Sequence, residues 1–430
     1  MVLTVICLMF FAMALLGMPL VWALLLTTIS TIWIFGQGYP LEAIFLSYIS
    51  SVEPLHLAAI PLFIFTGELI THGGVGKRLI NFARSLLAFM PGSLGVVTVS
   101  ACTMFGSVSG SAVADSAAIG SIMVPRMAER GYPRAFAGAL IAVAGTIGVL
   151  MPLSVPLLVY GFVGNVSIRE LLVSGVFPAF TLAFALILFC MWKGRKLGCD
   201  MGGEIPNKSE IGRSFIAILP ASGMPIVILG GIISGIFTPT EAASVAVFYG
   251  LILALFVYRE VKPAQIPGML LQSFRTSAVV MLVVGATGAL SWLITVEQVP
   301  ANLATAILEI AENKYVFLLL LNITLILVGI FLEPLPSLML TAPLFIPTAK
   351  ALGIDPVHLG LVMVFNLVIG LYTPPVGGTL FVAAKIARVG MVAISRELIP
   401  MFAIALIVLL IVTYVEAIPM SLVWFMRSLY

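Results

Sequence analysis

The chain has 430 residues, of which 61% are hydrophobic, with 21 basic and 18 acidic residues and a net charge of +3. Soluble domains carry about 25% charged residues, whereas this chain carries 9%. Most of its surface must therefore face lipid, and its apolar runs of about 20 residues are long enough to cross a bilayer core. The composition predicts an all-α polytopic membrane protein in a lipid bilayer. The weak net charge and the lack of a dense Lys/Arg block exclude nucleic-acid binding.

Polar breaks divide the apolar sequence, and their charges fall into two kinds. The apolar start, 1–35, is predicted as a retained membrane segment, because it is too long for a signal peptide and has no basic residue before it. The breaks rich in Lys and Arg lie near 71–92, 126–134, 193–213, 259–264 and 385–397. The breaks with acidic residues but no Lys or Arg are 36–56 and 297–312. The positive-inside rule places the first group in the cytoplasm and the second outside.

One apolar stretch, 94–125, lies between two basic breaks, although an ordinary span would put them on opposite sides of the membrane. Its middle, 106–115, reads Gly-Ser-Val-Ser-Gly-Ser-Ala-Val-Ala-Asp. A re-entrant hairpin that enters from the cytoplasm and turns at 109–111 explains both facts. Such irregular backbone requires cover by protein or by a water-filled cavity. The alternative is a close-packed span whose small residues let it approach a neighbour.

Two blocks of the sequence match at a constant offset of 222 residues. Pro125, Gly131, Gly138, Ile147, Gly148 and Pro152 fall on Pro347, Gly353, Gly360, Ile369, Gly370 and Pro374. Most of these matches are Gly or Pro, which fix backbone geometry. The chain is therefore predicted to contain two related halves, 1–192 and 214–430, joined by a cytoplasmic linker, 193–213.

Each half is predicted to contain one re-entrant hairpin and one interrupted transmembrane helix. The hairpins are placed at about 94–125 and 316–347, and the broken helices at about 135–163 and 357–384. The first hairpin has cytoplasmic flanks and the second follows an external break, so the repeats are inverted. Inverted repeats with discontinuous helices are typical of secondary transporters, which bind substrate near the membrane midplane.

Proline opens each broken helix and leaves carbonyl groups unpaired, and these groups favour a cation. We therefore expect Na⁺ sites where the hairpin tips face the breaks. The first ion site is predicted to contain Ser107, Ser109, Gly110, Gly148, Met151, Pro152 and Ser154. The second is predicted to contain Gly329, Glu333, Gly370, Thr373 and Val376. The candidate substrate-binding residues are Ser111, Asp115, Ser154, Pro156 and Thr379.

Ionisable groups at membrane depth are costly and by default functional, which singles out Asp115 and Glu333. Asp115 has two interpretations: it caps the second hairpin helix or bonds to the tip serines, or it binds an ion or proton. No Lys or Arg lies in the middle of either site. An anionic substrate would thus be held by helix N-termini, hydroxyl groups and bound cations, while a neutral substrate would need less explanation.

The sequence resembles one known family, the large membrane subunit of the tripartite ATP-independent periplasmic (TRAP) transporters. The resemblance covers nearly the whole chain, in the family's order. Its motifs are 59–63 with 67–68, 109–115, 131–132, 235–241, 353–356 and 370–377. One departure lies in the first broken helix, where Pro152-Leu153-Ser154 replaces the family's usual Pro-Pro-Ser.

The resemblance implies uptake of an organic acid, such as sialic acid or a C4-dicarboxylate, coupled to two or more Na⁺ ions. It further implies a bacterial inner-membrane location, a small membrane partner subunit and a periplasmic substrate-binding protein. Both hairpins would move as a transport domain, like an elevator, against a scaffold that includes 71–92 and 300–312.

The alternatives are a stand-alone ion-coupled anion carrier that needs no binding protein, a channel, and a membrane protease. The protease pattern at 107–110 lacks the first glycine of Gly-x-Ser-Gly and a histidine base facing it. A phosphate-loop pattern at 73–78 also fails, because Arg78 stands where Ser or Thr is required. The chain is therefore predicted not to be an enzyme.

Overall fold

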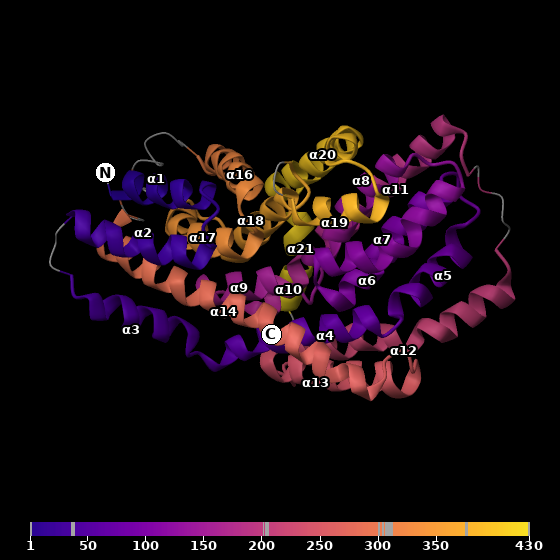
Figure 1. The fold of residues 1–430 in the computed structure, drawn as a ribbon, viewed down its shortest axis with the longest axis horizontal. Coiled ribbons are helices and arrows are strands. Elements are labelled where there is room, and N and C mark those ends of the chain that lie inside the picture. Colours follow the sequence, from indigo (N-terminus) through magenta and orange to yellow (C-terminus); the bar gives the residue numbers. More distant parts are fainter. Residues whose placement is uncertain are drawn as a thin grey trace.

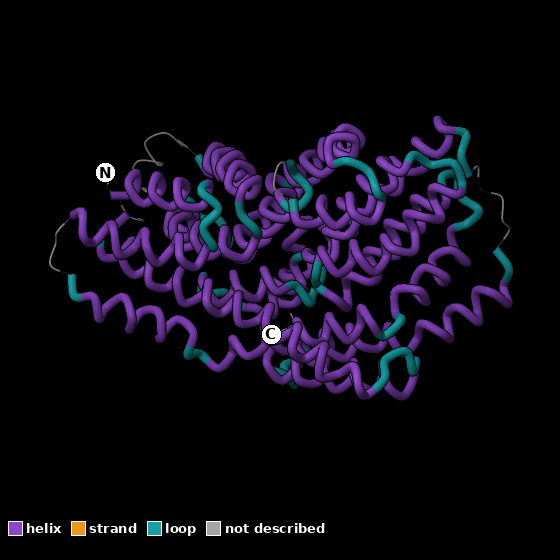
Figure 2. Tube along the Cα trace, in the orientation of Figure 1, coloured by secondary structure: helices purple, strands orange, loops and turns teal. Residues whose placement is uncertain are grey.

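The computed structural model describes residues 2–35, 39–200, 202, 206–299, 302, 305, 313–374 and 377–428. Within these ranges every regular element is a helix (Figure 2). Six of the described helices are long and apolar enough to cross a membrane, or seven if a bent pair, Arg134–Leu150 and Val155–Val163, counts as one span. The protein is thus an all-α polytopic membrane protein, as its composition predicts.

The helices of the two halves follow one another in chain order. The first half contains α1 (Val2–Leu15), α2 (Leu20–Phe35), α3 (Leu41–Val52), η1 (Leu55–Ala58), α4 (Ala59–His72), α5 (Val75–Leu87), α6 (Ser93–Ser109), α7 (Ala112–Glu129), α8 (Arg134–Ala144), η2 (Gly145–Leu150), α9 (Val155–Val163), α10 (Ile168–Ser174) and α11 (Val176–Leu197). The second half contains α12 (Lys208–Ile233), α13 (Pro239–Ile252), η3 (Leu253–Val257), η4 (Pro263–Gln265), α14 (Ile266–Val296), α16 (Lys314–Phe331), α17 (Pro334–Ala351), α18 (Pro356–Gly370), α19 (Gly378–Ala387), α20 (Met391–Tyr414) and α21 (Ala417–Ser428).

The apolar start is divided into two short helices, α1 and α2, where the sequence indicated one membrane segment. The division falls at 16–19. Gly17 adopts a left-handed conformation with φ of +80°, and Pro19 cannot donate a backbone hydrogen bond to the preceding turn. These two residues end α1 and begin a new helix.

An outer layer of helices runs along one edge of the molecule. Figure 1 shows α3, α14, α13 and α12 along the lower edge of the view, with the hairpins and broken helices above them. The 31-residue helix α14 packs against α2, α3 and α4, while α13 packs against α4 and α12 against α5. This layer forms one wall beside the polar elements.

The first helical hairpin consists of α6 and α7, which pack against each other. The turn falls at Gly110, whose φ of +64° is a left-handed conformation that favours glycine. Ser111 then begins α7, because its side chain accepts a hydrogen bond from the backbone N–H of Ala114. In the second half α16 and α17 form the matching pair, with the turn at Leu332 and Glu333.

The helix that follows each hairpin is interrupted. In the first half α8 tightens into the 3₁₀ helix η2, and the chain bends by 44° before α9 begins. Ser154 caps α9 by accepting a hydrogen bond from the N–H of Leu157. In the second half α18 ends at Gly370 and α19 begins at Gly378. Both interruptions leave helix ends inside the protein.

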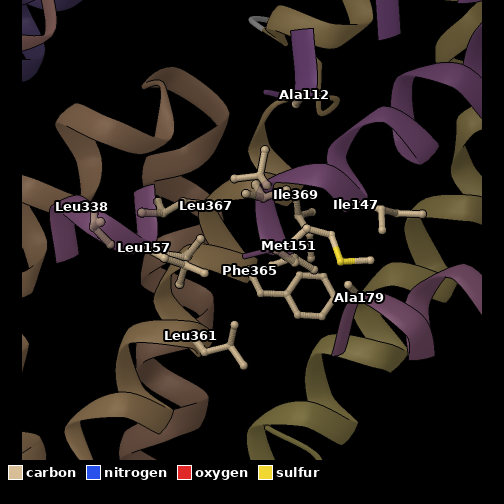
Figure 3. Packing of buried hydrophobic residues seen from close by; sticks show 14 of the residues in the cluster. Ala112, Ile147, Met151, Leu157, Ala179, Leu338, Leu361, Phe365, Leu367 and Ile369 are labelled. Atoms are coloured by element: carbon tan, nitrogen blue, oxygen red, sulfur yellow. The ribbon is translucent and has the colours of Figure 1, made fainter. Parts of the chain in front are cut away.

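The two halves exchange contacts across the centre of the molecule. Helix α7 of the first hairpin packs on α19 of the second half, and α17 of the second hairpin packs on α9 of the first. The first break also contacts the helix that precedes the second break, since η2 packs against α18. Figure 3 shows Met151 beside Phe365 and Ile369 of α18 in this apolar core. The two hairpin and broken-helix units therefore form one body.

Both ends of the predicted linker, 193–213, are helical, because α11 continues to Leu197 and α12 begins at Lys208. Between them, Asp200 turns back onto the start of α6. Its carboxylate accepts hydrogen bonds from Ser93 Oγ at 2.7 Å and from the backbone N–H of Leu94 at 2.8 Å. The linker thereby supplies the N-terminal cap of the first hairpin helix.

Candidate functional site

A buried carboxylate lies at the tip of the first hairpin. Asp115 is in the first turn of α7 and is fully buried. Its Oδ1 accepts a short hydrogen bond from Ser109 Oγ, the last residue of α6. Its Oδ2 has no hydrogen-bond partner among the described residues. Ser111 rather than Asp115 caps α7, so Asp115 bonds to a tip serine and leaves one oxygen unpaired among the described residues.

Two glycines bring the first hairpin into direct backbone contact with the first broken helix. A Cβ atom on Gly148 would lie 2.7 Å from Gly106 Cα and would overlap Asp115 Oδ2. A Cβ atom on Gly106 would overlap Gly148 Cα and lie 2.9 Å from Asp115 Oδ2. Only glycine fits at either position. The unpartnered carboxylate oxygen therefore lies at the point where the two backbones touch.

The hairpin turn also touches the break. A Cβ atom on Gly110 would lie 2.7 Å from the carbonyl carbon of Leu153. Helix α6 ends at Ser109 and η2 ends at Leu150, so two helix C-termini converge here. Helix C-termini carry partial negative charge and unpaired carbonyl groups. Together with Asp115 they form a region of negative potential at this contact.

The other residues predicted for the first ion site lie around this contact in different ways. Met151 and Pro152 are buried within the break, and the N–H of Met151 donates to Gly148 O at 3.1 Å. Ser154 is fully buried, and its N–H donates to Met151 O at 3.0 Å. Ser107 Oγ donates to Met104 O on its own helix at 2.7 Å. Its hydroxyl is thus used locally.

The second unit repeats the backbone contact with Gly329 and Gly370. A Cβ atom on Gly370 would lie 2.8 Å from Gly329 Cα, whereas one on Gly329 would meet its nearest atoms at 3.5 Å. Thr373 Oγ1 donates to Ile369 O at 2.7 Å and so extends the end of α18. Val376, the last member of the predicted second ion site, lies outside the described residues.

Glu333 lies at the N-terminal cap of α17 and is exposed. Its side chain lines a cavity of about 960 Å³ between α17 and the outer helices α2, α3 and α14. The other described residues that line this cavity bear no carboxyl group. No ion pair or side-chain hydrogen bond of Glu333 is found in the described part of the chain. The second carboxylate therefore faces the boundary between the outer layer and the second hairpin.

The candidate substrate-binding residues share a position at helix N-termini. Ser111 and Ser154 are the N-caps of α7 and α9, and Pro156 lies in the first turn of α9. Thr379 lies in the first turn of α19, is fully buried and donates from Oγ1 to Leu371 O at 2.9 Å. Helix N-termini carry partial positive charge and free N–H groups, which bind anions.

The structure adds polar residues that sequence reasoning missed. Ser337 of α17 is fully buried and its hydroxyl has no partner among the described residues. It follows Asp115 by 222 residues, so the internal repeat was a signal that could have found it. Asn366 Nδ2 donates to Asn322 Oδ1 at 2.7 Å, and Asn322 Nδ2 donates to Thr413 Oγ1 at 3.1 Å. These neutral groups link α16, α18 and α20 behind the second glycine contact.

An ion-pair cluster of Arg427, Glu170 and Asp355 ties the two halves together. Arg427 of α21 donates to Glu170 of α10 at 3.1 and 2.6 Å, and to Asp355, the N-cap of α18, at 2.7 Å. These hydrogen bonds, that with Glu170 foremost, raise the pKa of Arg427 above its ordinary value. The guanidinium thus stays charged and bridges the first half to the second.

The donor set of the first site suits a weakly charged cation. Among the described residues, no group of three or more His, Cys, Asp or Glu side chains is placed to hold a metal ion. One carboxylate, a serine hydroxyl and the carbonyl groups of two helix ends are hard oxygen donors with one full negative charge. Alkali cations prefer such ligands in transporters. The arrangement can hold a cation beside helix N-termini that favour an anion.

Comparisons with known proteins agree on one family. The sequence profile described as "Tripartite ATP-independent periplasmic transporter, DctM component" matches residues 7–418. The chain is 38% identical over 370 residues to the C4-dicarboxylate TRAP transporter large permease protein DctM of Pseudomonas aeruginosa, covering 86% of each chain. It is also 38% identical over 408 residues to the isethionate TRAP transporter permease protein DctMQ of Oleidesulfovibrio alaskensis. That match covers 94% of this chain, which spans only 64% of the relative's length.

A solved structure shows a similar fold. The YdaH transporter of Alcanivorax borkumensis, described as having an unusual topology, superposes with a TM-score of 0.61. The match covers 87% of this chain and 88% of the other, at 13% sequence identity. At this identity the likeness concerns the fold alone.

Proposed function

The chain belongs to the tripartite ATP-independent periplasmic transporters, as their DctM component, and we propose that it couples uptake of an organic acid to inward flow of Na⁺. Membership makes the chain a multi-pass inner-membrane transporter subunit and not an enzyme. The proposal adds the driving ion, the substrate class and the partners. It rests on one observation above all, the buried Asp115 oxygen at the contact between two glycine backbones.

The case for a cation starts from the cost of burying charge. Asp115 is fully buried, and no Lys, Arg or His forms an ion pair with it in the described part of the chain. An unpaired buried carboxylate is strongly destabilised unless it is neutralised. A Na⁺ ion bound by Asp115, Ser109 and nearby carbonyl groups would supply that neutralisation. Ion binding would then stabilise the closed contact between hairpin and broken helix.

The case for an anionic substrate starts from the helices that begin after the hairpin turn and after the two breaks. Ser111, Ser154 and Thr379 lie at helix N-termini, and Ser154 and Thr379 are fully buried. Their partial positive charge favours a carboxylate, and a Na⁺ ion close by adds to it. Cation and anion would therefore bind cooperatively, which is the physical basis of coupled transport. We propose two Na⁺ ions or more, one in each hairpin and broken-helix unit.

The substrate and partners follow from the relatives and stay proposals for this chain. One relative carries C4-dicarboxylate in its name and another isethionate, at the same 38% identity, so identity alone does not select the acid. The name DctMQ of the second relative, which is longer than this chain, fits a large subunit joined to a second part. We propose that this chain works with a small membrane subunit and takes its substrate from a periplasmic binding protein.

Uptake into proteoliposomes tests the proposal. The chain and a small partner subunit are reconstituted, and candidate binding proteins loaded with labelled organic acids are added outside. We expect uptake with an inward Na⁺ gradient, and none when K⁺ replaces Na⁺ under a proton gradient. Omitting the binding protein should also stop uptake.

Three results would each contradict a different part of the proposal. Uptake driven equally well by protons would reject Na⁺ coupling and make Asp115 and Glu333 the candidates for proton binding. Uptake without any binding protein would instead favour a stand-alone anion carrier. A flux far above carrier turnover, without saturation, would indicate a channel.

A further inference from the structure

A small cavity at the cytoplasmic end of the first hairpin carries a cluster of arginines. It has a volume of about 220 Å³ and lies between α5, the hairpin helices α6 and α7, and the linker. Arg84 comes from α5, while Arg126 and Arg130 come from the last turn and end of α7. None of these residues takes part in the proposed ion or substrate sites. The cavity therefore needs a separate explanation.

The helix that forms one wall of this cavity is amphipathic. Leu79, Ile80 and Ala83 of α5 are buried, whereas Lys77 and Arg84 are exposed seven residues apart, on the same face. The break that contains α5 is cytoplasmic by its charge. A helix of this kind lies in the interface between the bilayer and water, with its basic face toward lipid headgroups. The cavity thus opens at the level of the inner-leaflet headgroups.

The charges that line the cavity add up to one positive unit, because the three arginines face two acidic residues, Glu129 and Asp200. Asp200 is already occupied by the N-terminus of α6, through Ser93 and Leu94. The guanidinium of Arg126 forms no ion pair or hydrogen bond within the described part of the chain. One net positive charge matches the single negative charge of a phosphodiester.

Apolar side chains lie next to this basic cavity. Leu86 in the last turn of α5 and Phe89 just beyond the helix are 37% and 50% exposed. The Phe89 carbonyl lies close to Gly202, which lines the cavity. A ligand held by the arginines would therefore have an apolar surface beside it. A free inorganic anion gains no binding energy from an apolar surface, whereas the acyl chains of a lipid can pack against it.

We propose that this cavity, formed by Arg84, Arg126 and Arg130, binds the phosphodiester headgroup of an anionic phospholipid of the inner leaflet. Arginine binds phosphate oxygens through parallel N–H groups, which adds geometric specificity to charge attraction. Basic pockets between membrane helices on the cytoplasmic side are suited to such headgroups. A volume of about 220 Å³ admits a headgroup but lies below the usual range for larger ligands. The bound lipid contacts both α5 and the hairpin helix α7.

The test measures the melting temperature of the purified full chain in a neutral detergent and KCl buffer. Dioctanoyl phosphatidylglycerol, dioctanoyl phosphatidylcholine and inorganic phosphate are each titrated. We expect saturable stabilisation by phosphatidylglycerol alone. Arg126→Gln should raise its half-saturating concentration by about tenfold, the loss of one charge-assisted contact. Arg213→Gln, an exposed cytoplasmic arginine outside the cavity, should leave it unchanged.

Each other result overturns the proposal. Equal stabilisation by phosphatidylcholine would mean that acyl chains bind without the arginines. Equal stabilisation by inorganic phosphate would mean an ion site and no lipid site. If Arg126→Gln left the titration with phosphatidylglycerol unchanged, the cavity would not be the binding site. If that variant fails to fold, the same titration is made on wild-type protein at two salt concentrations. Raising KCl from about 0.05 to 0.5 M should weaken phosphatidylglycerol binding severalfold, because salt screens the charges. An affinity that stays constant would reject the site.

Discussion

The two hairpin and broken-helix units share a backbone plan but carry different polar groups. At the offset of 222 residues, Asp115 of α7 corresponds to Ser337 of α17, and both are fully buried with an oxygen that lacks a described partner. The tips correspond as well, since Ser111 and Glu333 are both N-caps. The first unit thus buries its carboxylate, whereas the second exposes its own and buries a hydroxyl. A repeated backbone can therefore support two sites of different charge.

The support behind the two contacts also differs. Among the described residues, the carboxylate of the first unit accepts a side-chain hydrogen bond from Ser109 only. In the second, neutral amides of Asn322 and Asn366 connect three helices behind the glycine contact. One atom of this network, Asn366 Oδ1, lacks a partner among the described residues, but an unpaired neutral amide costs less to bury than an unpaired charge. We infer that the first unit depends more on its ion than the second does.

The largest expected difference between the units concerns the glycines. Gly106→Ala should reduce uptake at least about 100-fold, because its Cβ would overlap Gly148 Cα, an overlap that also costs about 1–3 kcal/mol of stability. Gly329→Ala should retain uptake within about twofold, because its Cβ meets neighbours only at 3.5 Å, an ordinary van der Waals separation. Uptake in proteoliposomes and thermal unfolding in detergent measure both effects. Equal damage from the two variants would mean that the contacts are not as unequal as described.

The charge difference predicts the next effect. Asp115→Asn should lower Na⁺-driven uptake by about 100-fold, since a bound cation would lose its only full negative partner in a low-dielectric site. Ser337→Ala removes a neutral hydroxyl at the matching position and should lower uptake by less than about threefold, because that hydroxyl makes no hydrogen bond among the described residues. Expression and unfolding temperature serve as controls for folding. Similar losses in both variants would contradict the unequal roles of the units.

Much of the fold follows from local signals in the sequence, which explains what could be predicted. Length and hydropathy predict an all-α membrane protein, and Gly110 with its flanking serines predicts where α6 turns into α7. The bounds of the two repeats and the ion and substrate assignments stay predictions. Residues such as Gly106, Asn322 and Asn366 were missed, because their importance comes from helices that meet only in the folded chain. A glycine in an apolar run gives no sign of the backbone that it approaches.

The side chain of Glu333 illustrates the same limit. Its place at the turn between α16 and α17 could be inferred from the repeat, but its surroundings could not. The cavity that it lines is formed by α2, α3 and α14, which are distant in sequence. Local patterns place a residue in an element, whereas packing decides which other element it faces.

A smaller effect separates two serines of the first hairpin tip. Ser109→Ala should raise the Na⁺ concentration for half-maximal uptake by about tenfold, since it leaves Asp115 Oδ1 without its donor and such a loss costs about 1–3 kcal/mol. Ser107→Ala should change it by less than about twofold, because Ser107 Oγ bonds only to Met104 O of its own helix. Na⁺ titrations of initial uptake rates give both values. A larger effect at Ser107 would place its hydroxyl among the ion ligands.

The smallest expected effect concerns the link between the halves. Arg427→Gln breaks the ion pairs with Glu170 and Asp355, which are partly exposed and together contribute about 1 kcal/mol. We expect a small fall in unfolding temperature that shrinks at high salt, since salt screens exposed pairs, with uptake unchanged. The exposed Arg213, replaced by Gln, is the matched control. A large loss of uptake at normal stability would show that the bridge sets the relative position of the two units. The two units would then not act independently of each other.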